Sequence, residues 1–301
     1  MKIRVNLLRA AFAGLLAVAA AEAAAQSGDR VAVPLSDPSR PATLTVSLHR
    51  GGLTVTAYDG NEIVIVAREG QADDGGDEDR LADTRGQQRG PQRGQPRQQP
   101  GAEPPDEPRT DGLHRIPTSS LGMTATEHDN QVSVEIDFSQ RDVALEIQVP
   151  RRTSVHAATV NGGTLSITGV TGEHELENVN GSIVATDIAG ALVASTTNGK
   201  VQASFTEVTP AKAMSFSSFN GSLDVTFPAK LAATLLINSG RGEVFTDFDV
   251  EVQPQAAVIE RGGENGRNRV RVERETRALV GGGGPEIRFK TFNGSITIRK
   301  R

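Results

Sequence analysis

The stretch NVNGSIVATDIAGALVASTTNGKV, from Asn178 to Val201, contains two Asn-Gly pairs that are eighteen residues apart. Short runs of alternating apolar and polar residues fill the interval between them. Alternation with a period of two is typical of strands with one buried face, and Asn-Gly is typical of tight turns. The stretch therefore predicts β-structure whose turns recur at a regular interval.

The same turn recurs along the C-terminal half of the chain. The spacings between successive turns are 19, 18, 22, 19 and then 54 residues. Self-similarity at a nearly fixed period is the mark of a stacked array, in which each unit buries its face against its neighbours. The long last interval contains ERGGENGRNR and VGGGG, which predict an insertion and irregular units. The turns begin at Asn161, Asn180, Asn198, Asn220, Ser239 (a Ser-Gly variant) and Asn293.

Aligning the units on their Asn produces apolar columns on both sides of the turn. The positions six and four residues before the Asn, and three and five residues after it, are apolar in nearly every unit, and the residues between them are mostly polar. Each unit therefore has two strands with alternate residues facing inward. The inward columns are Val155, His174, Leu192, Met214 and Ile287; Ala157, Leu176, Ala194, Phe216 and Phe289; Ile183, Val201, Leu223 and Ile296; and Ala185, Ala203, Val225 and Ile298.

Two all-β folds satisfy this pattern locally. Asn-Gly between alternating strands is a strong signal for an antiparallel hairpin, whereas a β-solenoid stacks equivalent strands in parallel. A meander has no reason to repeat its side-chain columns, so we favour a β-helix-like solenoid with two short strands per coil of about 18–22 residues. Asn and Gly tolerate positive φ, and stacked Asn side chains could form a ladder. The predicted structural turn residues are Asn161, Gly162, Asn180, Gly181, Asn198, Gly199, Asn220, Gly221, Asn293 and Gly294.

The N-terminus has the composition of a secretory signal peptide. Lys2, Arg4 and Arg9 precede the apolar run 10–21, and Ala23-Ala24-Ala25 fits a cleavage site. We therefore expect residues 1–25 to be removed after Ala25. The protein would then act in a periplasm, at the cell surface or outside the cell, without a membrane span.

Three regions follow in the sequence. Residues 26–69 contain alternating strands such as ATLTVSLHR, and residues 113–301 contain the repeat. Between them, the run 70–112 combines an acidic block with Arg, Gln, Gly and Pro, and we expect a disordered low-complexity insert because almost nothing in it can be buried. The net charge of −5 does not favour nucleic-acid binding.

The stretch from LEIQVPRRTSVHAATVNGG onward, with the closing VGGGGPEIRFKTFNGSITIRK, resembles the bacterial putative-adhesin family of β-strand-repeat proteins, a domain of unknown function. The resemblance covers residues 132–301 and rests on Val149-Pro150 followed by serial Asn-Gly turns. It implies an exported β-helix-like domain with adhesion at the cell envelope, and it supplies no catalytic residues.

The residues offer little for catalysis or for a cofactor. The chain has no Cys, which excludes disulfides, thiolate metal sites and a Cys nucleophile. His156 and His174 are eighteen residues apart, but the columns place His174 inward and His156 outward, so we expect no metal site between them. The acidic residues of the repeats do not fall into one column, and we interpret them as solvated: Glu173, Glu175, Glu177, Asp187, Asp224, Glu243, Asp247 and Asp249.

Three functions remain open at this stage. The one we favour is a non-enzymatic envelope or surface protein that binds a glycan or protein through a solenoid face, and the Ser and Thr residues of the outward columns (Ser195, Ser215, Ser217, Thr226) suit such a face. The second is a carbohydrate-active enzyme with a site in the irregular segment 248–284, tested at Asp247, Asp249 and Glu264. The third is a structural or envelope-stress scaffold. A solenoid edge could also pair with another copy.

Overall fold

A computed structural model describes residues 29–69, 122–136, 142–209, 212–254, 258–262, 269–273 and 275–301. The predicted signal peptide (1–25) and insert (70–112) lie outside the described residues, as does Glu264. Within these ranges the protein is all-β and contains no helix. Nineteen strands belong to one sheet, and β17 (Val258–Gly262) and β18 (Arg269–Glu273) form a separate hairpin.

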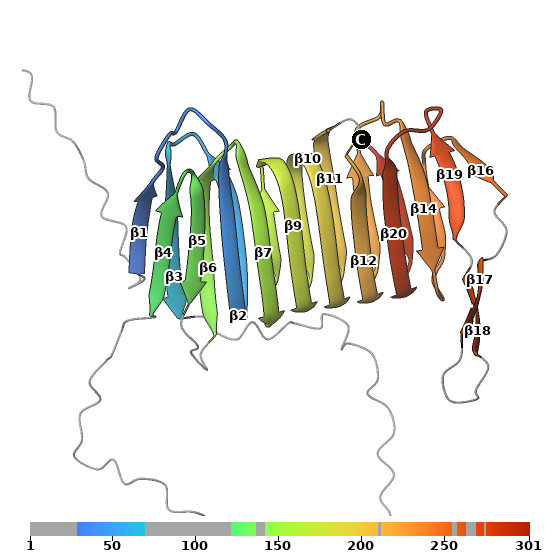
Figure 1. Ribbon diagram of the computed structural model, residues 1–301, viewed down its shortest axis with the longest axis horizontal. Coiled ribbons are helices and arrows are strands. Elements are labelled where there is room, and N and C mark those ends of the chain that lie inside the picture. The colour runs from blue at the N-terminus through green and yellow to red at the C-terminus, as the bar shows by residue number, and fades with distance from the viewer. Residues whose placement is uncertain are drawn as a thin grey trace, which may run out of the picture.

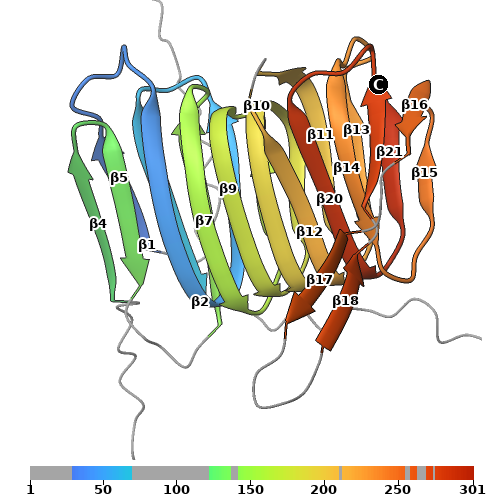
Figure 2. The ribbon, with the colours of Figure 1, turned by 45° about the vertical axis from the view of Figure 1, so that its right-hand side comes forward.

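The sheet is arranged as two facing layers, with the strands side by side along the long axis of the molecule (Figures 1 and 2). Two long strands, β2 (Ala42–Tyr58) and β10 (Ile183–Asn198), contribute one half to each layer. In spatial order, the first layer is β4 (Met123–His128), β5 (Gln131–Ile136), β2, β7 (Thr153–Asn161), β9 (Thr171–Asn180), β10, β12 (Met214–Asn220), β20 (Glu286–Asn293), β14 (Ala233–Ser239), β19 (Thr276–Val280) and β16 (Val250–Gln253). The second layer is β1 (Asp29–Pro34), β3 (Glu62–Glu69), β6 (Val143–Pro150), β2, β8 (Leu165–Thr168), β10, β11 (Val201–Val208), β13 (Leu223–Phe227), β21 (Ile296–Lys300) and β15 (Val244–Thr246).

Strands of successive repeats pair in parallel, so the hairpin alternative is wrong for the repeats. Ala194 pairs with Leu176 on one side and Phe216 on the other, and Ala185 pairs with Ile167 and Ala203. The register is therefore the one that the aligned Asn residues predict. Every residue of the four inward columns is buried, with at most 4% of its surface exposed.

The repeats do not stack in the order of the sequence. β20 pairs in parallel with β12 on one side and β14 on the other, and β21 lies in the same way between β13 and β15. Figure 1 shows β20 standing between β12 and β14. The final repeat of the chain is therefore inserted between two earlier ones, and β15, β16 and β19 lie beyond it.

The N-terminal strands are inserted in the same manner. The first half of β2 pairs with β5 and β7, and its second half pairs with β6 and β8. Thus β2 stands between strands that follow it by about 80 residues or more, as the register Leu44↔Val132 illustrates. β1, β2 and β3, which belong to a region that the sequence separates from the repeats, share one sheet with them.

Aromatic stacking anchors the inserted C-terminal strand in the core. Phe289 on β20 stacks on Phe216 on β12, with ring centroids 5.2 Å apart. Phe205 stacks on Phe227 at 5.1 Å in the opposite layer. All four rings are fully buried. The larger side chains lie where the chain order is broken, and they provide the apolar burial that offsets the cost of ordering distant segments.

Candidate functional site

The Asn-Gly turns form one continuous edge of the molecule, which we call the turn edge. The Nδ2 of Asn180 donates to the Oδ1 of Asn161 (3.1 Å), and the same bond joins Asn198 to Asn180, Asn220 to Asn198 and Asn293 to Asn220 (2.8 Å each). Four turn glycines, Gly162, Gly181, Gly199 and Gly221, also donate their N–H to the Asn carbonyl of the adjacent coil, as between Gly199 and Asn220 (3.1 Å). The turn edge is thus hydrogen-bonded through both side chains and backbone.

Two steric reasons favour glycine at these turns. Gly162, Gly181 and Gly294 have positive φ, as the sequence predicts for the turn glycines, whereas none of the ladder asparagines does. A Cβ on Gly221 would lie 1.9 Å from the carbonyl oxygen of Gly199, and a Cβ on Gly199 would lie 2.1 Å from that of Gly181. Glycine is therefore required both by positive φ in three turns and by the close approach of stacked turns, and Asn is favoured for its side-chain amide.

A second, buried ladder runs beside the first, and the sequence analysis missed it. The residue two positions before each Asn is polar and nearly inaccessible, and in three coils its hydroxyl donates to the turn-glycine carbonyl of the adjacent coil. Thr196 reaches Gly181 (2.9 Å) and Ser218 reaches Gly199 (2.9 Å). The signal was present as a uniform polar column: Thr159, Asn178, Thr196, Ser218 and Thr291.

The Ser-Gly variant does not occupy the turn position. Ser239 pairs with Thr291, which is two residues before Asn293. A Cβ on Gly242 would meet the carbonyl oxygen of Gly294 closely, so Arg241-Gly242 takes the place of an Asn-Gly pair in this coil. The guanidinium of Arg241 lies over the ring of Phe292, 5.1 Å from the centroid.

An exposed apolar row lies next to the amide ladder. The residue before each Asn points to solvent, and in four of five coils it is a Val or a Phe; Thr197 occupies the fifth. Phe219 and Phe292 stack on each other, with centroids 5.0 Å apart and an interplanar angle of 8°. The members and their exposed fractions are Val160 (36%), Val179 (41%), Phe219 (53%) and Phe292 (42%).

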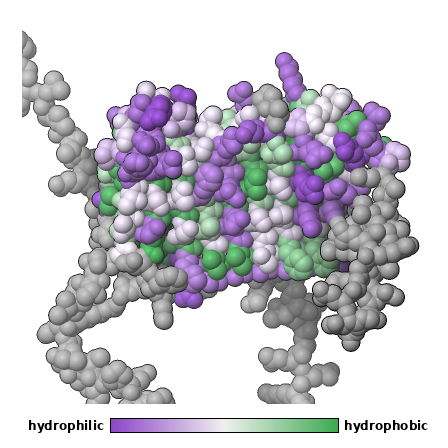
Figure 3. Space-filling model, viewed as in Figure 1, coloured by the Kyte–Doolittle hydropathy of each residue, from purple (hydrophilic) through white to green (hydrophobic). Residues whose placement is uncertain are grey.

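The outer surface of β7, β9, β10, β12 and β20, which we call the front face, carries separated charges. β9 presents Glu173, Glu175 and Glu177, and β20 presents Arg288 and Lys290. The strands between them present neutral side chains, including Ser195 and Ser217, whose hydroxyls are hydrogen-bonded at 3.0 Å. Figure 3 shows hydrophobic patches among the polar surface of the molecule in this view.

The two histidines lie on opposite sides of the first layer, as their columns predict. His174 is 3% exposed, and its Nδ1 accepts a hydrogen bond from the Val155 N–H at 3.3 Å. Burial lowers the pKa of His174 to about 4. His156 is on the front face, with its Nδ1 3.4 Å from Oε2 of Glu175. The two imidazole rings therefore do not converge on a common point.

The carboxylates that sequence reasoning examined are distributed over separate ion pairs. Asp224 binds Arg299 with two hydrogen bonds (2.9 and 3.1 Å), and Asp187 binds Arg301 (2.8 Å). Glu173 pairs with Lys212 at 2.8 Å. Asp247 accepts a hydrogen bond from the backbone N–H of Lys300 at 2.6 Å.

Among the described residues, no group of three or more His, Asp or Glu side chains is placed to hold a metal ion. The described part of the chain also has no helix of the length and apolarity that a membrane span requires.

Comparison with known proteins yields one distant structural similarity. No family model matches the sequence, and no curated protein matches it. Among solved structures, the chain is similar to one described as a putative cell adhesion protein from Clostridium sporogenes. The two are 8% identical, the match covers 91% of this chain and 100% of that chain, and the TM-score is 0.39.

Proposed function

We propose that this chain is an exported, non-enzymatic β-solenoid protein of the cell envelope or cell surface, adhesin-like, that binds a glycan or protein partner. The binding surface is the front face together with its apolar row. Export rests on the signal-like residues 1–25, and the solenoid description rests on the parallel, in-register pairing of successive repeats.

The observation that carries the proposal is the apolar row beside the amide ladder. Four large apolar side chains, each more than a third exposed, occupy the same position in four of five stacked coils, as a Val pair and a Phe pair separated by Thr197. Exposed apolar groups in a contiguous arrangement, bordered by polar groups, are characteristic of binding surfaces. The amides of Asn180, Asn198, Asn220 and Asn293 each use one N–H within the ladder, so a further N–H of each can donate to a hydroxyl or a carbonyl of a partner.

Co-sedimentation tests the proposal directly. The chain without residues 1–25 is mixed with isolated cell envelopes and with insoluble polysaccharides, and the bound fraction is measured against protein and salt concentration. We expect saturable binding that persists at moderate salt, because the contact is largely apolar. Protease-treated envelopes distinguish a protein partner from a glycan.

A pair of variants locates the contact. Phe219→Ser with Phe292→Ser removes the aromatic part of the row, and we expect it to abolish most of the binding. Val244→Ser with Phe245→Ser is the matched control, because these side chains are equally exposed (42% and 52%) on β15 of the opposite layer. Absence of binding to every fraction, or equal binding by both variants, would overturn the proposal.

A further inference from the structure

The broken order of the repeats leaves a groove on the edge opposite the turn edge. There, β11 is followed in the chain by β12, and both strands pair with β10. The connection 228–232 leads from β13 past β20 to β14, because β20 occupies the intervening position. No connection of the described residues fills the place between 205–209 and 228–232. A groove of about 400 Å³ lies there, within the range of ligand-binding pockets.

One wall of the groove is an open strand edge. β11 pairs with β10 as far as Val208, but its pairing with β13 ends at Ser204. The segment 205–208 therefore has a strand partner on one side only. Among the described residues, no backbone hydrogen bond joins 205–209 to 228–232. Unpaired N–H and C=O groups along such an edge are a template for another extended chain.

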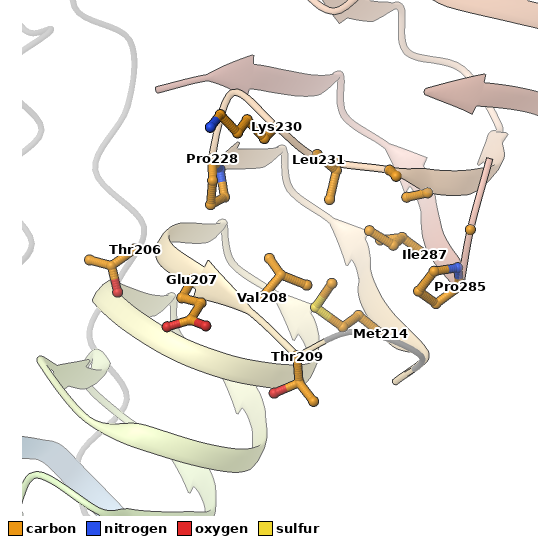
Figure 4. A pocket seen from close by; sticks show the side chains of 13 residues that line it. Thr206, Glu207, Val208, Thr209, Met214, Pro228, Lys230, Leu231, Pro285 and Ile287 are labelled. Atoms are coloured by element: carbon orange, nitrogen blue, oxygen red, sulfur yellow. The ribbon is translucent and has the colours of Figure 1, made fainter. Parts of the chain in front are cut away.

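The residues that line the floor and mouth of the groove determine which kind of segment it can bind. The side chains of Val208, Met214, Leu231 and Ile287 surround the hollow in Figure 4. Glu207 and Lys230 come from opposite walls, so their charges balance, and a strongly charged partner is not favoured. An apolar, uncharged segment suits this lining.

The preceding coils show how neighbouring segments at this edge are joined. Val170 follows β8 and Ile188 lies within β10; both side chains are fully buried, and this buried series continues through Phe205, the register partner of Ile188, and Phe227. Successive connections are hydrogen-bonded to each other, from the Ala189 N–H to the Val170 carbonyl (2.9 Å) and from the Thr209 N–H to the Gly190 carbonyl (3.0 Å). Among the described residues, no corresponding backbone bond leads from 228–232 to 205–209.

We propose that the groove binds an extended, uncharged apolar segment of another polypeptide, about four residues long, by strand addition to the open edge of 205–208. One aliphatic side chain of that segment faces Met214, Leu231 and Ile287, which form the apolar part of the groove lining. The run 70–112 of this chain is a poor occupant, because it is rich in Gln, Gly, Pro and Arg. The proposal depends neither on the front face nor on export.

The test uses a peptide taken from the chain itself. The full chain is titrated against a fluorescently labelled, end-capped peptide of sequence ITGVTG, which is that of Ile167–Gly172. The control peptide STGSTG lacks both aliphatic side chains. We expect saturable binding of the first peptide and roughly tenfold weaker binding of the second, because the apolar contact is lost. No saturable binding, or equal binding of both peptides, would overturn the proposal.

Two variants and one independent measurement locate the site. Ala232→Phe obstructs the groove from an exposed lining position, whereas Ala229→Phe makes the same change on an exposed residue outside the lining. We expect the first variant to lose peptide binding and the second to retain it. In the unmodified chain, bound peptide should slow hydrogen exchange at the amides of 206–209. Protection elsewhere, or binding unaffected by Ala232→Phe, would contradict the assignment even if the front-face proposal holds.

Discussion

Asn220 and Asn293 are 73 residues apart in the chain, and the amide of Asn293 donates to the Oδ1 of Asn220 at 2.8 Å. This bond forms because the last repeat is inserted next to β12. It adds Asn293, which is distant in the chain, to a ladder whose other asparagines come from consecutive repeats. The contribution of the ladder to stability can therefore be measured at this junction.

We expect Asn220→Ala to lower the free energy of unfolding by about 1–2 kcal/mol, because two ladder hydrogen bonds are lost, one to Asn198 and one to Asn293. Asn161→Ala is the control, since Asn161 makes one ladder bond, to Asn180. Urea unfolding measures both. Equal effects of the two substitutions would argue against an additive ladder.

Close stacking of the turns predicts that Gly221→Ala is severely destabilising. The added Cβ would lie 1.9 Å from the Gly199 carbonyl oxygen, so two coils must separate, at a cost of about 3 kcal/mol or more. Gly52→Ala is the matched control, because its Cβ would approach only the Thr164 carbonyl oxygen, at 3.7 Å. Thermal melts and soluble yield report the difference; tolerance of Gly221→Ala would refute the steric explanation.

His174 predicts a loss of stability on acidification. Its pKa is lowered to about 4 in the folded protein by burial, whereas the unfolded chain titrates near its ordinary value of about 6.5. The unfolded state therefore binds the proton first, and stability falls as the pH falls from about 6.5 to 4, by roughly 3 kcal/mol in total. We expect His174→Leu, which introduces the residue found at the equivalent position 192, to reduce the change of the unfolding midpoint with pH between about 6.5 and 4.

The position of β20 predicts unequal roles for two phenylalanines on one strand. Phe289 is fully buried against Phe216, so Phe289→Ala should cost about 3–5 kcal/mol. Phe292 is 42% exposed, and we expect Phe292→Ala to cost less than half as much. Denaturant midpoints of both variants test this ordering. A larger effect of Phe292 would mean that the exposed stack, rather than the core, holds β20 in place.

The inward columns were predictable because stacking in register repeats the same environment in every coil. Val155, Leu192 and Ile287 occupy equivalent positions, and a short alignment on Asn finds them. The polar column containing Thr196 and Ser218 was visible in the same alignment, but a buried hydroxyl resembles a surface one until its acceptor is known. Local patterns thus determine what faces inward in each coil.

The spatial order of the coils was not predictable from these patterns. β20 carries the same signature as β12, so nothing local indicates that it stands between β12 and β14. The substitution of Arg241-Gly242 for an Asn-Gly turn depends on that placement as well, because Ser239 is the closer match in sequence. The groove beside 205–208 exists because the connection 228–232 passes the position of β20, and no sequence motif predicts it.

The inserted repeat has a consequence for how the protein reaches its native state. A chain synthesised from its N-terminus presents β14 and β19 before β20, although the described structure gives β14 no pairing with β12. If each coil assembled on the previous one in chain order, assembly would therefore stop after β12 and β13. Contacts spanning some 70 residues complete it, and such long loop closures slow folding. Until the final strands arrive, two open sheet edges face each other across a gap of one coil, and this interval is when the chain is most exposed to mispairing.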